Sequence, residues 1–352
     1  MKKTLVAIAA LTLVGAVSAQ SSVTLYGRID ASLASNKTSL NGTTTSDGGA
    51  LISSGGHTGS RWGMKGSEDL GGGLKANFQL EQGFNVDTGA QSAGSSAACA
   101  VLPCAAVVAR QFHRAAWVGL SGGFGAVTVG RQYDITDNMY GMYDASGYSG
   151  YSAMNYSFNK GSGGDFIGRQ DNAVMYSAPS MGGFGVTAMW APGENKTSAV
   201  SAGSNVGVMA NYANGPIGAG IGYQSNKATG ATSATTNTVF GGSYKLAAAK
   251  LYGMYQMSKT PSVVGSPKDN GWHLGVVVPV GPTTVTAAYA SEKTKFAGVE
   301  TTNNKALSLM VQYNLSKRTY VYAAYLNGEV DPAGAANTTK NRNMGLGLVH
   351  NF

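Results

Sequence analysis

The chain has 352 residues, and only 12% of them are charged, roughly half the share of about 25% that is usual in soluble domains. The 25 lysines and arginines exceed the 17 acidic residues, which gives a net charge of +8. No apolar stretch beyond the N-terminal region is long enough for a membrane-spanning helix, so a helical membrane protein is excluded. A chain this poor in charge favours a membrane β-barrel, in which only alternate residues meet lipid.

The N-terminal segment has the parts of a secretory signal peptide. Lys2 and Lys3 form a short basic region, an apolar run covers Leu5 to Val17, and Val17-Ser18-Ala19 fits a small-x-small cleavage pattern. A membrane anchor is the alternative, but the run is shorter than the roughly 20 residues that span a bilayer. We therefore expect residues 1–19 to be removed and residues 20–352 to form one domain with a net charge of +6. Export argues against a nucleic-acid partner and leaves small anions.

Short segments in which apolar and polar residues alternate recur along the rest of the chain. A period of two places the two sets on opposite faces of a β-strand. A soluble sandwich would show the same alternation, but the scarcity of charge and the number of segments favour lipid outside and water inside. We predict an all-β fold, a transmembrane antiparallel up-and-down β-barrel of about 16 strands, a size that leaves an aqueous lumen. Clear examples of the apolar set are Leu74, Ala76, Phe78 and Leu80; Val285, Ala287 and Tyr289; and Leu307, Leu309, Val311 and Tyr313.

The connections between these segments come in two sizes, as they do at the two rims of an outer-membrane barrel. Short connections rich in Gly, Pro, Asn or Asp are expected at Glu68–Gly73, Ser121–Gly125, Pro179–Gly183, Asn214–Pro216, Gly281–Pro282 and Ser316–Arg318. Long polar connections are expected at Asn36–Gly56, Asn85–Ala109, Asp134–Gly168, Lys227–Thr235 and Glu329–Lys340.

Cys99 and Cys104 lie close together in one of the long connections. An exported protein meets oxidising conditions that favour pairing, so we predict a disulfide that restrains this loop. Two free thiols are the alternative. A zinc site would need further ligands nearby, and only His113 is near in sequence.

The last segment alternates up to the final residue of the sequence. Met344, Leu346 and Leu348 share their parity with Phe352, and the intervening residues face the other way. The same parity places His350 outward, which an amphipathic ring near the rim tolerates.

Four arginines fall on the water side of the predicted strands. Each has the parity opposite to an apolar neighbour on its own segment, so its side chain is expected to face the lumen. Alternatively, these arginines only solubilise the lumen or pair with carboxylates. Arg131 shares the parity of Val127 and Val129 and, without a bulge, would face outward, so it is left out of the set. The inward arginines are Arg28, Arg61, Arg114 and Arg169.

Several stretches carry a resemblance to a known family. They are Ser22-Val23-Thr24-Leu25-Tyr26-Gly27, Ser60-Arg61-Trp62-Gly63, Lys65–Leu74, Phe78-Gln79-Leu80-Glu81, Trp117-Val118-Gly119-Leu120, Gly130-Arg131-Gln132-Tyr133 and the terminal Phe352. Together they resemble the Gram-negative general porins of the sixteen-stranded trimeric type, especially their anion-preferring branch. The resemblance covers essentially the whole mature chain, and the segment from Cys99 to Cys104 departs from it. It implies a homotrimer in outer-membrane lipid that passes small hydrophilic solutes and inorganic anions.

The resemblance also implies where the pore is narrowest. Arginines at the positions of Arg61, Arg114 and Arg169 would cluster on the wall of the constriction, with Glu81 and Asp144 nearby. The connection 134–168 would fold inward and narrow the pore. It contains Asp134, Asp137, Asp144 and Asp165 against a single Lys160, so an acidic loop would face a basic wall.

The sequence contains no pattern typical of catalysis, and we expect neither an enzyme nor a cofactor or metal. The four histidines are scattered, with no metalloprotease spacing and no order typical of a catalytic triad. The glycine-rich run Gly122–Gly125 is interpreted as a tight turn and not as a phosphate site. Most of the 18 tyrosines are assigned to interfacial girdles and lumen walls, and a sugar-stacking track is the alternative. An outer-membrane enzyme or adhesin with its activity in the long loops remains the second hypothesis.

Overall fold

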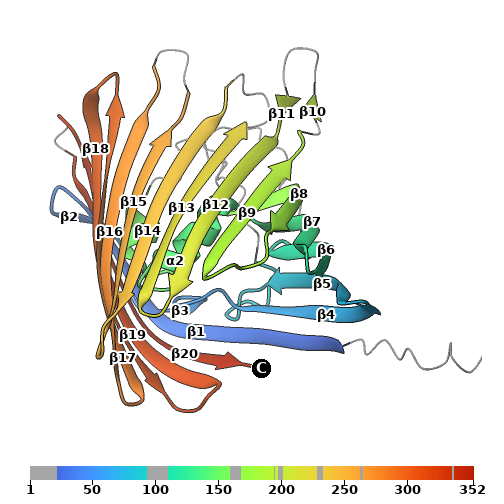
Figure 1. Cartoon of the computed structure of the whole chain (residues 1–352). Helices are drawn as coiled ribbons and strands as arrows, with labels where there is room; N and C mark the ends of the chain where they lie inside the picture. Colours follow the sequence, from blue (N-terminus) through green and yellow to red (C-terminus); the bar gives the residue numbers. More distant parts are fainter. Residues whose placement is uncertain are drawn as a thin grey trace, which may run out of the picture.

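The computed structural model describes residues 22–92, 110–158, 168–193, 195–196, 201–227, 233–261, 265–334 and 337–352. The expected signal peptide and the segment with Cys99 and Cys104 lie outside these residues, so both remain predictions. Within the described part of the chain, sixteen antiparallel strands form a closed barrel (Figure 1). They are β1 (Ser22–Leu40), β4 (Arg61–Gly71), β5 (Leu74–Gly83), β6 (Ala115–Gly122), β7 (Gly125–Tyr133), β8 (Arg169–Ser177), β9 (Phe184–Ala191), β12 (Ser204–Asn214), β13 (Ile217–Lys227), β14 (Thr235–Lys245), β15 (Lys250–Lys259), β16 (Lys268–Val280), β17 (Thr283–Phe296), β18 (Val299–Asn314), β19 (Thr319–Pro332) and β20 (Thr339–Asn351).

The alternation of apolar and polar residues sets the two faces of the barrel wall. In β18, Leu307, Leu309 and Val311 are 38%, 44% and 44% exposed on the outer face, whereas Ser308 between them is buried on the inner face. An antiparallel ladder satisfies every backbone group except at a free edge, and closure removes the edge. The predicted fold class is therefore confirmed.

The ring closes where the last strand meets the first. β1 pairs with β20 from Arg28 opposite Asn351 to Leu40 opposite Thr339, and with β4 on its other side. Phe352 and Gly27 exchange two backbone hydrogen bonds, both at 3.0 Å. A Cβ atom on Gly27 would come within 2.2 Å of the Phe352 ring, so only glycine leaves room for this aromatic end. The parity predicted for the last strand is confirmed, with Met344, Leu346 and Leu348 exposed and Val349 buried.

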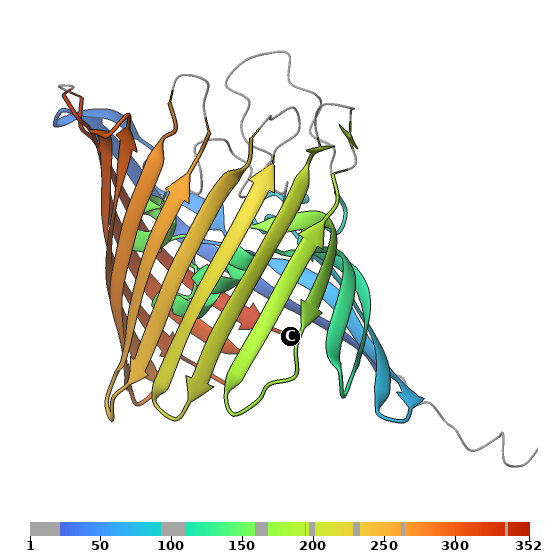
Figure 2. The same cartoon turned by 45° about the horizontal axis from the view of Figure 1, so that its top comes forward.

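The two sizes of connection lie at opposite rims, with the short turns at the bottom of Figure 2 and the long ones at the top. Two of the predicted long connections are largely strand. β1 continues to Leu40 and is followed by the short strands β2 (Thr43–Asp47) and β3 (Leu51–Ser54), while β19 reaches Pro332. These stretches are polar and lack the apolar–polar alternation of the membrane-facing strands, so the sequence pattern did not identify them as strands. The sequence interpretation also missed three connections at the upper rim: 192–203, which contains β10 (Asn195–Lys196) and β11 (Ser201–Ala202), 260–267, and the two-residue turn 297–298 between β17 and β18. At the lower rim it missed the turn 246–249 between β14 and β15.

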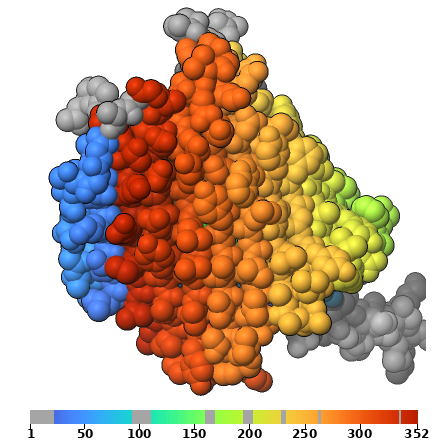
Figure 3. Space-filling view, turned by 90° about the vertical axis from the view of Figure 1, so that its left-hand side faces the viewer, coloured from blue at the N-terminus to red at the C-terminus, as the bar shows by residue number. Residues whose placement is uncertain are grey.

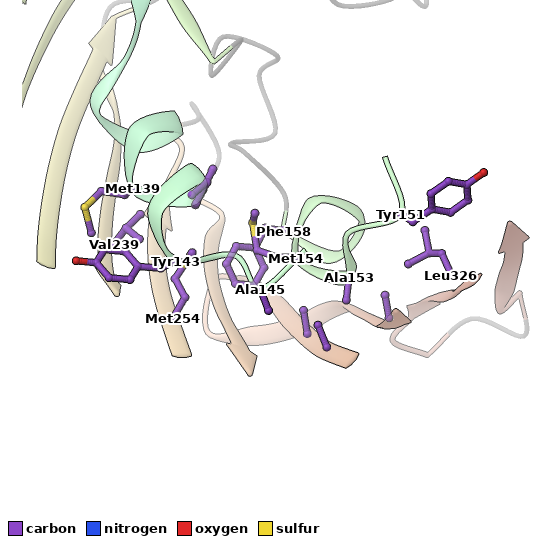
Figure 4. Close-up of a cluster of buried hydrophobic side chains, with 14 of the residues drawn as sticks. Met139, Tyr143, Ala145, Tyr151, Ala153, Met154, Phe158, Val239, Met254 and Leu326 are labelled. Carbon is purple, nitrogen blue, oxygen red and sulfur yellow. The ribbon is translucent and has the colours of Figure 1, made fainter. Parts of the chain in front are cut away.

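The connection between β7 and β8 folds into the barrel, as the resemblance implied. It contains α2 (Ile135–Tyr143) and α3 (Ala153–Ser157), and both helices lie inside the ring of strands (Figure 2). Neither is long and apolar enough to cross a membrane. Figure 4 shows Met139 and Tyr143 of α2 beside Val239 and Met254 of the wall, so the apolar core lies between this loop and the strands.

Glycines on the inner face of the wall make room for the loop. Added Cβ atoms would lie 2.1 Å from Tyr143 at Gly241 and 2.7 Å from Met139 at Gly222. Polar contacts hold the same loop, because Gln224 accepts a hydrogen bond from the Thr136 backbone at 2.9 Å. The two helices contact strands β9 and β12 to β19, and the Tyr156 hydroxyl accepts a hydrogen bond from Asn341 of β20 at 2.7 Å. The arginine-bearing part of the wall lies across the lumen from this loop.

Candidate pore constriction

The four arginines predicted to face inward lie at one cavity inside the barrel. They come from β1, the start of β4, the residue before β6 and the start of β8, which are neighbouring parts of the wall. The infolded loop lines the other side of the cavity. The wall contributes Arg28, Arg61, Arg114 and Arg169, and the loop contributes Asp137, Asn138, Gly141, Met142, Gly147 and Tyr148.

Glu81 lies beside two of these arginines. Its Oε1 is 2.6 Å from Arg114 Nε, and its Oε2 is 3.7 Å from Arg61 Nε. The Tyr26 hydroxyl donates to the same carboxylate at 2.9 Å and accepts from Gln79 at 2.6 Å. A nearly buried carboxylate with two cationic neighbours reduces the repulsion between them.

Tyr133 joins Arg114 and Arg169, and the sequence did not indicate it. Its hydroxyl oxygen accepts hydrogen bonds from Arg114 Nη2 at 3.0 Å and from Arg169 Nη2 at 2.7 Å. The Arg169 guanidinium also lies 4.4 Å from the centre of the Tyr133 ring, a distance typical of a cation–π contact. One neutral side chain therefore holds two cations at a set separation.

A β-bulge explains why Tyr133 was missed. Strict alternation from Val127 and Val129 would point it toward lipid, but the register between β7 and β8 shifts between Gly130 and Gln132. Gly130 has a φ of +132°, where an L side chain is strained. The extra residue turns the end of β7, so that Tyr133 pairs with Arg169 and faces the cavity.

Arg131 occupies the bulge itself and is only 9% exposed, so it does not face outward as strict alternation would place it. Its Nε donates to the His113 carbonyl, and its Nη1 contacts the carboxylate of Asp171. Arg110 binds the other oxygen of Asp171 at 2.9 Å. Arg131 therefore belongs to a separate ion-pair group and does not line the cavity.

A buried carboxylate in the wall holds the turn that supports Arg28 and Arg61. Asp30, which is fully buried, accepts the backbone N–H groups of His57 at 2.8 Å and Thr58 at 2.7 Å. Thr58 then accepts from Arg28 at 3.0 Å, and the Gly59 carbonyl accepts from Arg61 at 3.1 Å. Burial, together with the charge of Arg28, lowers the pKa of His57 to about 4, so the ring is neutral at neutral pH.

Asp144 does not line the cavity, in contrast to what the resemblance implied. It ends α2, and its side chain turns back toward the wall, where it is 0% exposed and 3.4 Å from His273 Nε2. It also accepts the backbone N–H groups of Ser146 at 3.1 Å and Tyr148 at 2.8 Å. Burial raises the pKa of Asp144. Asp137 is the carboxylate that the described part of the loop brings to the cavity, while Asp165 and Lys160 lie outside the described residues.

The cavity therefore has a basic wall and a weakly acidic loop side. The wall contributes four guanidinium groups and, beside two of them, the carboxylate of Glu81, while the loop contributes the carboxylate of Asp137, so the charge balance is positive. Each guanidinium stays charged and offers several donors to an anion. Such a cluster of guanidinium groups creates a positive electrostatic potential at the cavity.

Comparison with protein families gives one match that covers most of the chain. The family model described as Gram-negative porin matches residues 4–333. Among curated proteins, outer membrane porin protein 32 of Delftia acidovorans is 34% identical over 92% of this chain and 88% of its own length. An outer membrane porin protein of Bordetella pertussis is 30% identical over the full length of both chains.

Solved structures include similar barrels. An anion-selective porin from Comamonas acidovorans superposes with a TM-score of 0.78 and is 30% identical, with 95% of this chain and all of that chain covered. The OmpT outer membrane protein of Vibrio cholerae superposes with a TM-score of 0.65 at 18% identity, with 94% and 98% covered, which shows the shared fold alone.

Proposed function

This chain belongs to the Gram-negative porin family and is a general diffusion porin of the outer membrane, and we propose that its pore favours small anions over cations. The observation that carries the proposal is the gathering of Arg28, Arg61, Arg114 and Arg169 at one cavity opposite the infolded loop. The anion selectivity of the similar Comamonas acidovorans porin is consistent with it. The comparisons give no support to an enzyme or adhesin.

The field of the arginines acts through water. Repulsion between four guanidinium groups is tolerable in a high dielectric and beside a carboxylate such as Glu81. The field reaches about 30 Å at 0.01 M salt and about 10 Å at 0.1 M. Anion preference should therefore be strongest at low ionic strength.

A reversal potential in a salt gradient across a bilayer tests this proposal without any added substrate. Replacing Arg61, Arg114 and Arg169 together with glutamine should shift selectivity toward cations and weaken the salt dependence of the conductance. Arg342 is exposed on the outer face, so Arg342→Gln is a control for loss of positive charge elsewhere. An unchanged reversal potential in the triple variant would show that the arginine cluster does not set selectivity.

We also propose a homotrimer, as the family resemblance implies. Chemical crosslinking in mild detergent should yield a band of three chains. Crosslinking that stops at one chain would contradict trimerisation and leave the selectivity proposal intact.

A further inference from the structure

Three lysines form a row across neighbouring strands at the rim of long connections. Lys259 of β15 is the direct partner of Lys268 of β16, and Lys268 is the direct partner of Lys295 of β17. Direct partners project from the same face with Cβ atoms about 4.5–5.5 Å apart, and like charges in such positions are destabilising. An anion bound between the lysines would relieve this repulsion.

The row faces away from the pore. Lys259 has the parity of Tyr255 and Met257, which are 42% and 40% exposed on the outer face. Lys268 has the parity of Trp272, whereas Asp269 beside it is fully buried on the inner face. The wall formed by β15 to β17, gold to orange in Figure 3, belongs to the outer surface of the barrel.

Within the described residues, none of the three lysines forms an ion pair. Glu300 of β18 is the strand partner of Lys295, but its carboxylate lies 2.9 Å from the ammonium of Lys293 instead. Further round the same rim, Glu329 lies 3.7 Å from Lys305 and 3.4 Å from Lys340. The connection 260–267 contains no acidic residue in its sequence. The row is thus a concentrated positive charge that the nearby acids do not neutralise by direct contact.

Aromatic side chains place the row relative to the membrane. Trp272 lies on the outer face with its ring centroid 5.4 Å from that of Tyr289, and Tyr255 lies opposite Trp272 on β15. Such rings mark the membrane–water interface of a barrel. Lys259 and Lys268 lie four residues nearer the rim along their strands, about 13 Å at roughly 3.3 Å per residue, and the strands are tilted. Their ammonium groups therefore reach the level of lipid headgroups.

We propose that Lys259, Lys268 and Lys295 bind the phosphate groups of a lipid headgroup in the outer leaflet. Lysine ammonium groups bind phosphate as compact point charges. Adjacent strands are about 4.8 Å apart, so the row extends over about 10 Å and can contact a headgroup with two phosphates. A phosphate carried by a lipid fits better than a free phosphate. The three lysines lie on the same outer face as Tyr255, Trp272 and Tyr289, between these interfacial rings and the rim, where lipid headgroups are found.

Native mass spectrometry of the purified protein with diphosphorylated lipid A, and with the same lipid lacking both phosphates, tests the proposal. The parent should bind the phosphorylated form preferentially. The variant Lys259→Gln/Lys268→Gln/Lys295→Gln should lose roughly a hundredfold in affinity for it. The control removes three lysines from the opposite rim, Lys245→Gln/Lys250→Gln/Lys317→Gln, and should bind like the parent.

Equal binding by the row variant and the parent would overturn the proposal. So would equal binding of the two lipids by the parent. Inorganic phosphate is added as a competitor, and its displacement of the lipid at millimolar concentration would assign the row to free anions instead. Heat-resistant migration of both triple variants in gels checks that the barrel has formed.

Discussion

Tyr133 is the residue on which the geometry of the arginine cluster most directly depends. Its phenol oxygen accepts hydrogen bonds from two guanidinium groups that would otherwise repel each other. Hydrogen bonds to charged groups contribute about 1.5–3 kcal/mol each to stability. A neutral side chain can thus position charge without changing the charge balance of the cavity.

We expect Tyr133→Phe to weaken anion preference without abolishing it. The ring remains beside Arg169, but both guanidinium groups lose their shared acceptor and move apart, so the field at the cavity falls. The reversal potential should move toward zero by less than in the triple arginine variant. Tyr255→Phe, which alters an exposed hydroxyl on the outer face, is the matched control. A reversal potential equal to that of the parent would argue against the role of the phenol.

The second prediction at this scale concerns pH and His57. Its pKa of about 4 in the folded protein lies below the usual value of about 6.5, so the unfolded chain binds the proton more readily. The stability that this group contributes is complete above pH 6.5 and is lost as the pH falls from 6.5 to 4. His57→Gln should reduce the fall in unfolding temperature between pH 7 and pH 4 relative to the parent. An identical pH dependence in parent and His57→Gln would refute the assignment.

At the scale of elements, the infolded loop is held by the shape of the wall. Inner-face glycines of β13 and β14 receive the side chains of α2, and the polar end of Gln224 holds the start of the helix. The abundance of glycine in the sequence has this structural role in addition to its role in turns. The width of the opening therefore depends on residues that do not line it.

Gly241→Val should displace the loop. The new Cβ would lie 2.1 Å from Tyr143, and overpacking of this kind costs about 1–3 kcal/mol. Single-channel recordings should show altered and fluctuating conductance, and protease should cut the segment 134–158 more readily. Gly242→Val is the matched control, because the nearest atom to its Cβ is 3.7 Å away. Steady parental conductance in Gly241→Val would show that the loop is positioned by other contacts.

At the scale of the whole molecule, closure of the ring joins the two ends of the described chain. The backbone bonds between Gly27 and Phe352 complete the ladder, and the Phe352 ring packs over the glycine. An open edge in a membrane would leave backbone groups without partners. The terminal residue thus supports the barrel as a whole.

Phe352→Ala should lower the unfolding temperature of the barrel in detergent. The backbone bonds remain, but the packing over Gly27 is lost. Because the ring is 42% exposed, the cost should be about 1–3 kcal/mol, less than the roughly 3–5 kcal/mol for a fully buried phenylalanine. Leu346→Ala, at a side chain 62% exposed on the outer face, is the control. If both variants unfold at the same temperature, the terminal ring has no special role in closure.

Much of this barrel follows from local pattern. A period of two assigns each side chain to lipid or water, and this was enough to predict that Arg28, Arg61, Arg114 and Arg169 face the lumen, where the structure gathers them at one cavity. The position of Glu81 near the arginines and the infolding of the loop were predicted from the family resemblance, because no local sequence signal indicates the direction in which a loop folds. The polar extension of β1 was misjudged because alternation disappears where a strand leaves the membrane.

The sequence by itself determined most of the barrel strands, their two faces and the inward direction of the four arginines, since these depend on backbone geometry that repeats every two residues. The tertiary structure decided the position of Tyr133, the burial of Asp144, the placement of inner-face glycines against the side chains of the loop, and the row of lysines on adjacent strands. Each of these depends on a bulge, a helix end or a register between segments, and such non-local contacts have no periodic signal along the chain.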